Sequence, residues 1–414
     1  KKFEVELAPL SVILGANASG KSNLLDAIYL LSQLVSRRNL QEAFKGHRGL
    51  PLESFYYADC GYEELLRKQS LRFSLEVDVE LSDWVRKRVR DIVLEKRRGI
   101  ERPSDQRQKE VVGEKFPRYR LELEALPRTG HVRVMDEKLA AIKRNGEEKK
   151  SRNPFIERVA QRGIERIHLR MEGQAHPTYH EIGLEHTIVS SPLYEPHYPH
   201  IAALRMELEN WRVYYLEPRT LMREEVPLAK AKSVGPRGDN LAAFLNVVKN
   251  EHPGADGLRA FNLALNQVMP TEAQVEVYPT EEGRVGLRLS ENGIHYSARL
   301  MSEGTLRLVG LLAAVHPANQ ATLVAFEEPE TGVHPVRLKI ISDILKQAAE
   351  SGKQIIVTSH SSVLPTYFTH HDLFVCRKEG LSTTIKPFSW GPLFLRQEIE
   401  QALEDRILRG DLGG

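Results

Sequence analysis

The feature that most constrains this chain is the stretch LGANASGKSN, residues 14–23. Residues 15–22 match the pattern G-x-x-x-x-G-K-[ST] completely, and in that pattern backbone N–H groups converge on the phosphate oxygens of a nucleotide. The apolar residues 8–15 before it predict a strand, and apolar residues at a helical period over 21–35 predict a helix after it. Strand, glycine loop and helix in this order predict a phosphate-binding loop at a helix N-terminus.

The residues of this loop have separate tasks. Lys21 is expected to reach the β- and γ-phosphates, and the hydroxyl of Ser22 is expected to hold Mg²⁺. We assign nucleotide binding to the whole loop, namely Gly15, Ala16, Asn17, Ala18, Ser19, Gly20, Lys21, Ser22 and Asn23.

A buried strand that ends in carboxylates is the expected second half of such a site. TLVAFEEPE, residues 322–330, fits this description, since four apolar residues precede Glu327 and Glu328. We assign Glu327 to the Mg²⁺ sphere and Glu328 to the role of general base on the attacking water. Aspartate is the usual metal-side residue, and the longer Glu327 leaves open whether its contact is direct or through water.

Two more elements carry residues of the right chemistry. KQIIVTSHS, residues 353–361, is a buried strand that ends at His360, and one helix separates it from the carboxylate strand, as expected for neighbouring parallel strands. His360 would there hydrogen-bond the γ-phosphate or the attacking water. In residues 300–315, Ser302 is a good N-cap and Gly304 permits close approach of a ligand. This segment predicts either a second anion-binding helix N-terminus or a plain capped core helix.

Together the four elements resemble the head of an ABC-type ATPase, and more narrowly its RecF/SMC/OLD branch. Asn23 in the loop is similar to the asparagine of that branch. MSEGT, residues 301–305, resembles the ABC signature with Glu303 in place of a glycine. FEEPETGVHP, residues 326–335, resembles the Walker B strand with its D-loop, and VTSHS, residues 357–361, resembles the His switch.

Within the branch, the Glu-Glu-Pro-Glu form at 327–330 and the closing LEDRILRGDLGG, residues 403–414, look most like stand-alone OLD-like ATPases of prokaryotic anti-phage defence, which lack a Toprim nuclease. The resemblance implies an α/β fold: an ABC-type P-loop NTPase head with a mixed or parallel sheet core, plus an inserted basic α+β subdomain. It also implies ATP and Mg²⁺ as cofactors. The stretch after His360 is too short for a Toprim domain, so we expect no nuclease activity in this chain.

The same resemblance implies a mechanism. Two heads sandwich two ATP molecules, so that Ser302, Glu303 and Gly304 of one head act on the nucleotide held by the loop of the other, and hydrolysis opens the sandwich. Two features depart from the family pattern. His334 stands where a D-loop commonly has aspartate, and we identify no residue for the loop glutamine that often completes the metal shell.

Charge divides the chain. Its net charge is +2, but residues 84–170 hold 25 Lys and Arg against 14 Asp and Glu. We divide the chain into an N-terminal lobe of the head at 1–83, a charged insertion at 84–210 and a C-terminal lobe at 211–414. The insertion is either a surface for DNA or an acidic partner, or a solvated, partly helical segment. The histidines crowded in residues 168–200 are interpreted as a polar surface loop rather than a zinc site, because no cysteine accompanies them.

No uninterrupted apolar run is long enough to span a bilayer, and Cys60 and Cys376 lie far apart without a partner motif, as is usual in a reducing cytosol. We therefore expect a cytoplasmic, Mg-dependent ATPase that has no membrane contact and forms a homodimer or higher homo-oligomer. Its head dimerisation would control a separately encoded effector, a nuclease or toxin, in anti-phage defence. The alternatives are a RecF-like repair ATPase that binds DNA through the insertion and a multimeric scaffold that uses ATP mainly for assembly.

Overall fold

The computed structural model describes residues 3–388 except 47, 48, 50, 56–60, 98–109, 162, 173–175, 251–256, 270 and 362. Contacts between residues divide the chain into two compact units, of which the first is Lys1–Leu25 with Arg212–Gly414 and the second is Asp26–Trp211. The first unit is therefore built from both ends of the chain. The second unit begins at Asp26, whereas the charge pattern places the start of the insertion at residue 84. The closing LEDRILRGDLGG and Cys60 lie outside the described residues.

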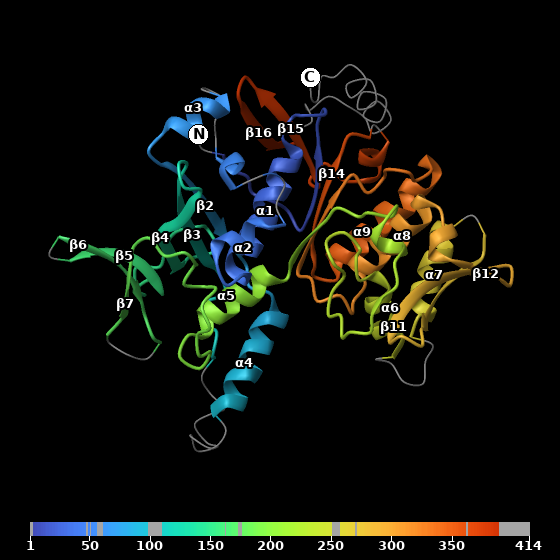
Figure 1. Ribbon diagram of the computed structural model, residues 1–414, viewed down its shortest axis with the longest axis horizontal. Coiled ribbons are helices and arrows are strands. Elements are labelled where there is room, and N and C mark those ends of the chain that lie inside the picture. The colour runs from blue at the N-terminus through green and yellow to red at the C-terminus, as the bar shows by residue number, and fades with distance from the viewer. Residues whose placement is uncertain are drawn as a thin grey trace. The chain divides into compact units, whose positions relative to one another are not determined.

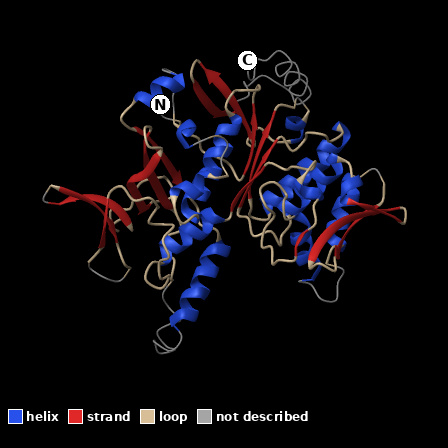
Figure 2. Ribbon diagram, viewed as in Figure 1, coloured by secondary structure: helices blue, strands red, loops and turns tan. Residues whose placement is uncertain are grey.

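A six-stranded sheet forms the centre of the first unit (Figures 1 and 2). Its strand order is β16-β15-β1-β14-β13-β8. Strand β1 pairs in parallel with β14 and β15, β14 pairs in parallel with β13, and β15 and β16 are antiparallel, so the sheet is mixed with a parallel core, as predicted. The bounds are Leu10–Leu14 for β1, Trp211–Tyr214 for β8, Leu323–Glu327 for β13, Gln354–Ser359 for β14, Leu373–Glu379 for β15 and Ser382–Pro387 for β16.

The central strands are apolar because both of their faces are covered. Every residue of β1 is buried, and β13 and β14 are buried except at one end, which is the pattern of parallel strands between two layers. Helix α9 (Leu338–Glu350) is the crossover from β13 to β14 and packs on β14 and β1. Helix α8 (Glu303–Val315) packs against α9.

A second layer of the first unit lies on these helices (Figure 1). Helices α6 (Leu241–Asn250) and α7 (Arg259–Val268) pack against α8 and also against β10, in a small antiparallel sheet. Phe244 and Phe261 are buried in the core that these elements share. The strands of the small sheet are β9 (Val226–Pro227), β10 (Ala273–Pro279), β11 (Arg284–Glu291) and β12 (Ile294–Ser297).

The second unit contains a six-stranded antiparallel sheet of order β2-β3-β4-β5-β6-β7. Its strands are β2 (Leu71–Asp78), β3 (Pro117–Leu126), β4 (His131–Ala141), β5 (Ile156–Gln161), β6 (Ile164–Leu169) and β7 (Thr178–Glu181). Its helices are α2 (Leu40–Phe44), α3 (Gly61–Arg67), α4 (Asp83–Arg97) and α5 (Pro199–Glu209), and α1 (Lys21–Ser36) starts in the first unit and ends in this one.

The amphipathic patterns predicted for this unit are confirmed. Strand β2 alternates between more and less buried residues, and α4 buries Val85, Val89 and Val93 at a helical spacing. Strand β2 pairs with β3 along its whole length. The residues of β2, which the charge pattern assigns to the head, therefore share a sheet with the basic segment.

The histidine-rich segment is not a surface loop throughout, so that expectation is wrong for part of it. His168 and His200 are buried. The Nδ1 atom of His200 lies 2.7 Å from the carboxylate of Glu172, and its ring stacks on Phe155. Among the described residues, no group of three or more His, Cys, Asp or Glu side chains is arranged to hold a metal ion. None of the helices in the described ranges is long and apolar enough to cross a membrane.

Candidate nucleotide site

Parallel pairing brings three of the predicted elements together in the first unit. Strand β14 lies between β1 and β13, with Leu14 opposite Ser359 and Glu327 opposite Thr358. The carboxyl ends of these strands therefore meet at one edge of the sheet, where ligands bind in open α/β sheets. The glycine loop follows β1, the two carboxylates end β13, and His360 follows β14.

The glycine loop folds over its own lysine. Ala18 and Gly20 have positive φ angles of 62° and 105°, and α1 begins directly afterwards at Lys21. The Nζ atom of Lys21 donates to the carbonyl oxygens of Gly15 at 2.6 Å and Ala16 at 2.9 Å. Burial lowers the pKa of the Lys21 ammonium, and nearby carboxylates act in the opposite direction. The ammonium is thus held by two carbonyls of its own loop, which phosphate oxygens could replace.

The β15–β16 hairpin packs directly on this loop, a contact that the sequence analysis missed. A Cβ atom on Gly15 would lie 2.5 Å from the carbonyl oxygen of Cys376, and one on Gly20 would collide with Thr383. The hydroxyl of Thr383 donates to the carbonyl of Ser19 at 2.9 Å. The two glycines are therefore needed for packing within the chain as well as for approach to phosphates.

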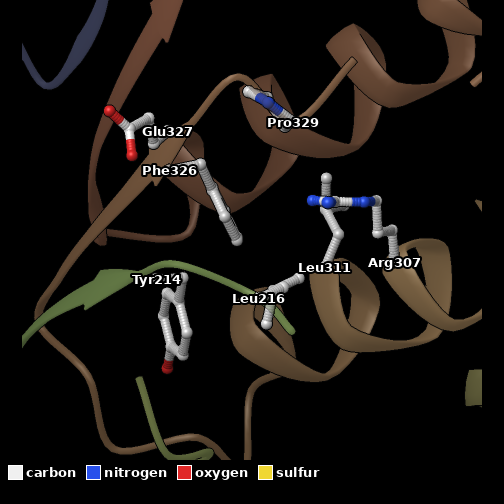
Figure 3. Close-up of a pocket in the computed structure, with 7 residues that line it drawn as sticks. All are labelled: Tyr214, Leu216, Arg307, Leu311, Phe326, Glu327 and Pro329. Atoms are coloured by element: carbon white, nitrogen blue, oxygen red, sulfur yellow. The ribbon is translucent and has the colours of Figure 1, made fainter. Parts of the chain in front are cut away.

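Ser22 and Glu327 face each other across the site. The Oγ atom of Ser22 donates a hydrogen bond to Oε1 of Glu327. A hydroxyl and a carboxylate are oxygen donors of the kind that Mg²⁺ prefers, so this pair fits the metal expected beside the phosphates. Figure 3 shows Glu327 at the end of β13, with Phe326 before it extending toward Tyr214.

The floor under Glu327 is packed. The rings of Phe326 and Tyr214 stack with centroids 5.4 Å apart. The pocket beside them has a cavity volume of about 10 Å³, which is room for roughly one water molecule. The pocket in Figure 3 is therefore too small to hold a nucleotide, and the side chains around it pack under the strand. Its lining residues are Tyr214, Leu216, Arg307, Leu311, Phe326, Glu327 and Pro329.

Glu328 and His360 form the second pair of the site. The Nδ1 atom of His360 lies 2.9 Å from Oε1 of Glu328. The backbone of Glu328 has a φ angle of 48°, and its N–H donates to the carbonyl of Thr358 at 2.9 Å. A left-handed conformation at a residue with a side chain costs energy and tends to occur at functional positions. Two residues further on, Glu330 accepts a hydrogen bond from Ser359, a second contact that the sequence analysis missed.

The signature segment begins α8 as predicted. Ser302 is its N-cap and accepts a hydrogen bond from the N–H of Thr305 at 3.1 Å. A Cβ atom on Gly304 would lie 2.6 Å from the carbonyl oxygen of Gly332, so the signature and the D-loop are in contact. Glu303 accepts a hydrogen bond from Nε of Arg219 at 2.6 Å. Among the described residues, residues 302–304 form no hydrogen bond or ion pair with the glycine loop of the same chain.

His334 has a structural task in the D-loop. Its side chain accepts a hydrogen bond from the N–H of Val336 and caps the short 3-10 helix Pro335–Arg337. An aspartate could cap in the same way. The departure from the family's aspartate is therefore compatible with the turn that the D-loop makes.

A comparison with known families matches residues 10–129 and 194–364 to AAA_21, described as "AAA domain, putative AbiEii toxin, Type IV TA system". The matched residues cover more than half of the chain and include the glycine loop, the signature segment, both carboxylates and His360. The chain belongs to this family. It is accordingly a P-loop ATPase of the AAA_21 family.

Solved structures similar to this AAA_21 chain include heads of SMC proteins. A SmcHead bound to the C-winged helix domain of ScpA covers 94% of both chains with a TM-score of 0.52 and 12% identity. The SMC head domain of Thermotoga maritima covers 93% of both chains with a TM-score of 0.37 and 13% identity. The first likeness shows that the fold is that of an ABC-type P-loop head, which confirms the expected fold class.

A short segment is similar to an ATP-binding cassette protein. ATP-binding cassette sub-family A member 17 of Rattus norvegicus is 37% identical over 60 residues. The match covers 14% of this chain and 3% of that protein. The chain therefore shares only a small part of the length of this relative.

Proposed function

We propose that this chain binds ATP with Mg²⁺ and hydrolyses it, and that ATP-driven pairing of two heads controls a separately encoded effector. The observation that carries the hydrolysis is the convergence, at one edge of the sheet, of Lys21, the Ser22–Glu327 pair and the Glu328–His360 pair. These groups supply phosphate binding, metal binding and a general base within one site.

The chain's own groups divide the work of hydrolysis. Lys21 exchanges the carbonyls of Gly15 and Ala16 for phosphate oxygens. The new hydrogen bonds are charge-assisted, and the ammonium is already shielded from water before the nucleotide binds. Ser22 and Glu327 would hold Mg²⁺, which neutralises charge on the phosphates when it is bound. Glu328 takes a proton from the attacking water, and the His360 ring, whose Nδ1 lies 2.9 Å from the carboxylate, holds the direction of Glu328.

A site completed by a second copy is part of the proposal. Ser302 presents a helix N-terminus that suits an anion. Two apolar side chains beside this surface are strongly exposed: Leu300, two residues before Ser302, is 75% exposed, and Val336, after the D-loop, is 76% exposed. Large exposed apolar side chains next to polar functional groups are typical of a surface that a partner covers. We therefore propose a homodimer in which Ser302, Glu303 and Gly304 act on the nucleotide of the other subunit.

The basic segment favours a protein partner over DNA. Within residues 84–170 many cations are already paired with carboxylates of the second unit, so part of the positive charge of this segment is neutralised within the unit and is not available to phosphates. The paired cations include Arg86, Lys96, Lys115, Arg118, Arg133, Lys138, Lys143, Lys149, Arg152, Arg158 and Arg170. Direct loading on DNA, as in a RecF-like repair ATPase, is the second candidate, and its support is the net positive charge of this segment.

The proposed biological setting rests on the sequence resemblance. The Glu-Glu-Pro-Glu form resembles that of OLD-like ATPases of prokaryotic anti-phage defence, and we propose the same setting, in the cytoplasm, with a nuclease or toxin as the effector. An assembly that uses ATP mainly to hold a scaffold together would keep its effector even when Glu328 is replaced by Gln. An ATPase that gates its effector would not.

The first experiment measures ATP turnover and mass of the purified chain alone, with duplex DNA, and with the product of the neighbouring gene. We expect Lys21-dependent turnover and a stable complex with the neighbouring product. Lys21→Ala should abolish ATP binding, whereas Lys339→Ala, an exposed lysine of α9, should leave it unchanged. Stimulation by DNA alone would favour the repair function, and ATP affinity unchanged in Lys21→Ala would contradict the assignment of the site.

A further inference from the structure

We propose that Glu330 is a positioning residue for ATP hydrolysis: through Ser359 it fixes the end of β14 from which His360 projects. The inference rests on the proposed function, because it assigns a further residue to the same site. Glu330 is the third carboxylate of the Glu-Glu-Pro-Glu sequence, and neither the metal role nor the base role uses it.

The contact between Glu330 and Ser359 is buried. The Oγ atom of Ser359 donates to Oε1 of Glu330 at 2.5 Å. Ser359 is fully buried, and Glu330 is 9% exposed. The same Oγ atom accepts a hydrogen bond from the N–H of Ser361 at 3.0 Å. The Glu330 carboxylate is therefore connected, through one hydroxyl, to the residues on both sides of His360.

A second, more exposed contact, between Glu328 and His360, joins the same two segments. Both Glu328 and Glu330 lie in the turn after β13, and both Ser359 and His360 lie at the end of β14. The Glu328–His360 pair is half-exposed, so water competes for it, whereas the Glu330–Ser359 pair is shielded. A shielded hydrogen bond is the stronger restraint of the two. Glu330 therefore holds the two strand ends at the separation at which His360 meets Glu328.

The turn that carries Glu330 is itself tied down. The N–H of Thr331 donates to the carbonyl of Glu328 at 3.1 Å, and the N–H of Val333 donates to the carbonyl of Glu330 at 3.0 Å. The N–H of Glu328 extends the ladder between β13 and β14 by its bond to Thr358. The Glu330 side chain thus starts from a fixed backbone, which is what a positioning residue needs.

Stability alone does not explain a carboxyl group at this position. The Oε2 atom of Glu330 is buried and has no hydrogen-bond partner among the described residues. Burial also raises the pKa of this carboxyl. An unpaired buried oxygen is a cost to folding, and such costs are typical of groups that serve a site. The hydrogen bond with Ser359 is the interaction through which Glu330 would act on the site.

Steady-state kinetics of the full chain test the proposal. Glu330→Ala and Ser359→Ala should each lower kcat about 10- to 100-fold, since a small displacement of a catalytic group costs that much, and should leave KM for ATP within about twofold. The double variant should be no slower than the worse single variant, because both changes break one contact. Glu330→Gln keeps an acceptor oxygen for Ser359 and should retain most of the wild-type kcat.

A second measurement needs no nucleotide. Glu330→Ala and Ser359→Ala should speed hydrogen exchange in peptides that cover the end of β14, because the N–H of Ser361 loses its fixed acceptor. Ser342→Ala is the matched control: Ser342 is a fully buried serine of α9 whose Oγ donates to the carbonyl of Lys339 at 2.6 Å. It should change neither exchange at β14 nor kcat.

Three results would overturn the proposal. They are wild-type kcat in Glu330→Ala or Ser359→Ala, effects of the two changes that multiply in the double variant, and unchanged exchange at the end of β14. If Glu330→Ala does not fold, Ser359→Ala and Glu330→Gln carry the same comparison. Wild-type protein without ATP turnover would instead contradict the proposed function. Active wild-type protein, together with variants whose kcat and hydrogen exchange equal those of the wild type, would contradict this inference alone.

Discussion

Ser22 donates a hydrogen bond to Glu327 across 305 positions of the chain. This contact joins the start of α1 to the end of β13 and so connects the phosphate loop with the carboxylate strand. Each of the two residues proposed to hold Mg²⁺ is the other's hydrogen-bond partner. The proposed metal site is therefore largely formed by the fold itself, which would lower the cost of ordering it when Mg²⁺ and ATP bind.

The first prediction concerns this pair. Ser22→Ala and Glu327→Gln should each raise the Mg²⁺ concentration needed for half-maximal ATP turnover about tenfold or more, because the first removes an oxygen donor and the second replaces a charged carboxylate by a neutral amide. The double variant should show less than the product of the two effects, since the two donors share one ion. A Mg²⁺ titration of turnover at fixed ATP measures this. Glu350→Gln, an exposed glutamate of α9, is the control, and an unshifted titration in both single variants would remove the pair from the metal.

The second prediction concerns the Glu328–His360 pair. Glu328→Gln should lower kcat by roughly 10²- to 10⁴-fold, which is the usual contribution of a general base, while ATP still binds. His360→Ala should lower kcat less, since its proposed effect on the base is orientation. Single-turnover kinetics with bound ATP separate the chemical step from binding.

The matched control for His360 is another histidine of the same unit. His370→Ala changes an exposed histidine in the turn before β15 and should retain wild-type kcat. Full activity of Glu328→Gln would show that another group accepts the proton of the attacking water.

Local patterns predicted most of the fold around the site. The loop 14–23, the carboxylate strand, the strand that ends at His360 and the N-cap Ser302 all occur where periodicity and capping place them. These features are readable because each depends on residues within one strand or one helix turn. Their meeting at one edge also follows, because neighbouring parallel strands end on the same side.

Long-range contacts were not predictable in the same way. The hairpin that packs Cys376 and Thr383 on the glycine loop lies more than 350 positions away in the sequence. No residue pattern within the loop predicts this contact. The Glu330–Ser359 contact had a weak signal, since a third carboxylate follows a buried strand and a serine precedes His360. The same holds for the division of the chain: charge changes at residue 84, but strand pairing across β2 and β3 decides which residues form one unit.

The third prediction tests whether the site is shared between two copies. Ser302→Arg should bind ATP through its intact loop but not hydrolyse it, and Lys21→Ala should do neither. In a mixed dimer, one site combines both defects, whereas the other combines an intact loop with an intact signature. Mixing the two inactive variants should therefore restore turnover, up to about half of the wild-type rate per dimer that forms as a mixed pair.

Two controls accompany this experiment: each variant is mixed with itself, and the protein concentration is varied. Neither variant should gain activity when mixed with itself, and the restored rate should rise with protein concentration, because association is required. If the mixture stays inactive although both variants form dimers by mass, the signature acts within its own chain or not at all.

The fourth prediction concerns pH and the second unit. Glu137 in β4 is fully buried, and its carboxylate accepts hydrogen bonds from Tyr119 at 2.9 Å and from the N–H groups of Ile188 at 2.6 Å and Val189 at 3.1 Å. Burial nevertheless raises the pKa of Glu137 from 4.5 to about 7. The folded protein thus binds this proton more tightly than the unfolded chain does. Stability from this group is fully present below pH 4.5 and is lost as the pH rises through 7.

The expected loss is on the order of 3 kcal/mol, because each pKa unit corresponds to about 1.36 kcal/mol. Hydrogen exchange of peptides that cover β4, corrected for the intrinsic effect of pH on exchange, measures the opening free energy at pH 5 and pH 7.5. Protection should fall between the two pH values in the wild type and should change little in Glu137→Gln, which does not titrate. Glu165→Gln, an exposed glutamate of β6, should keep the wild-type slope. Protection that rises with pH in the wild type would mean that the three donors outweigh burial and hold the carboxylate charged, with its pKa lowered instead of raised.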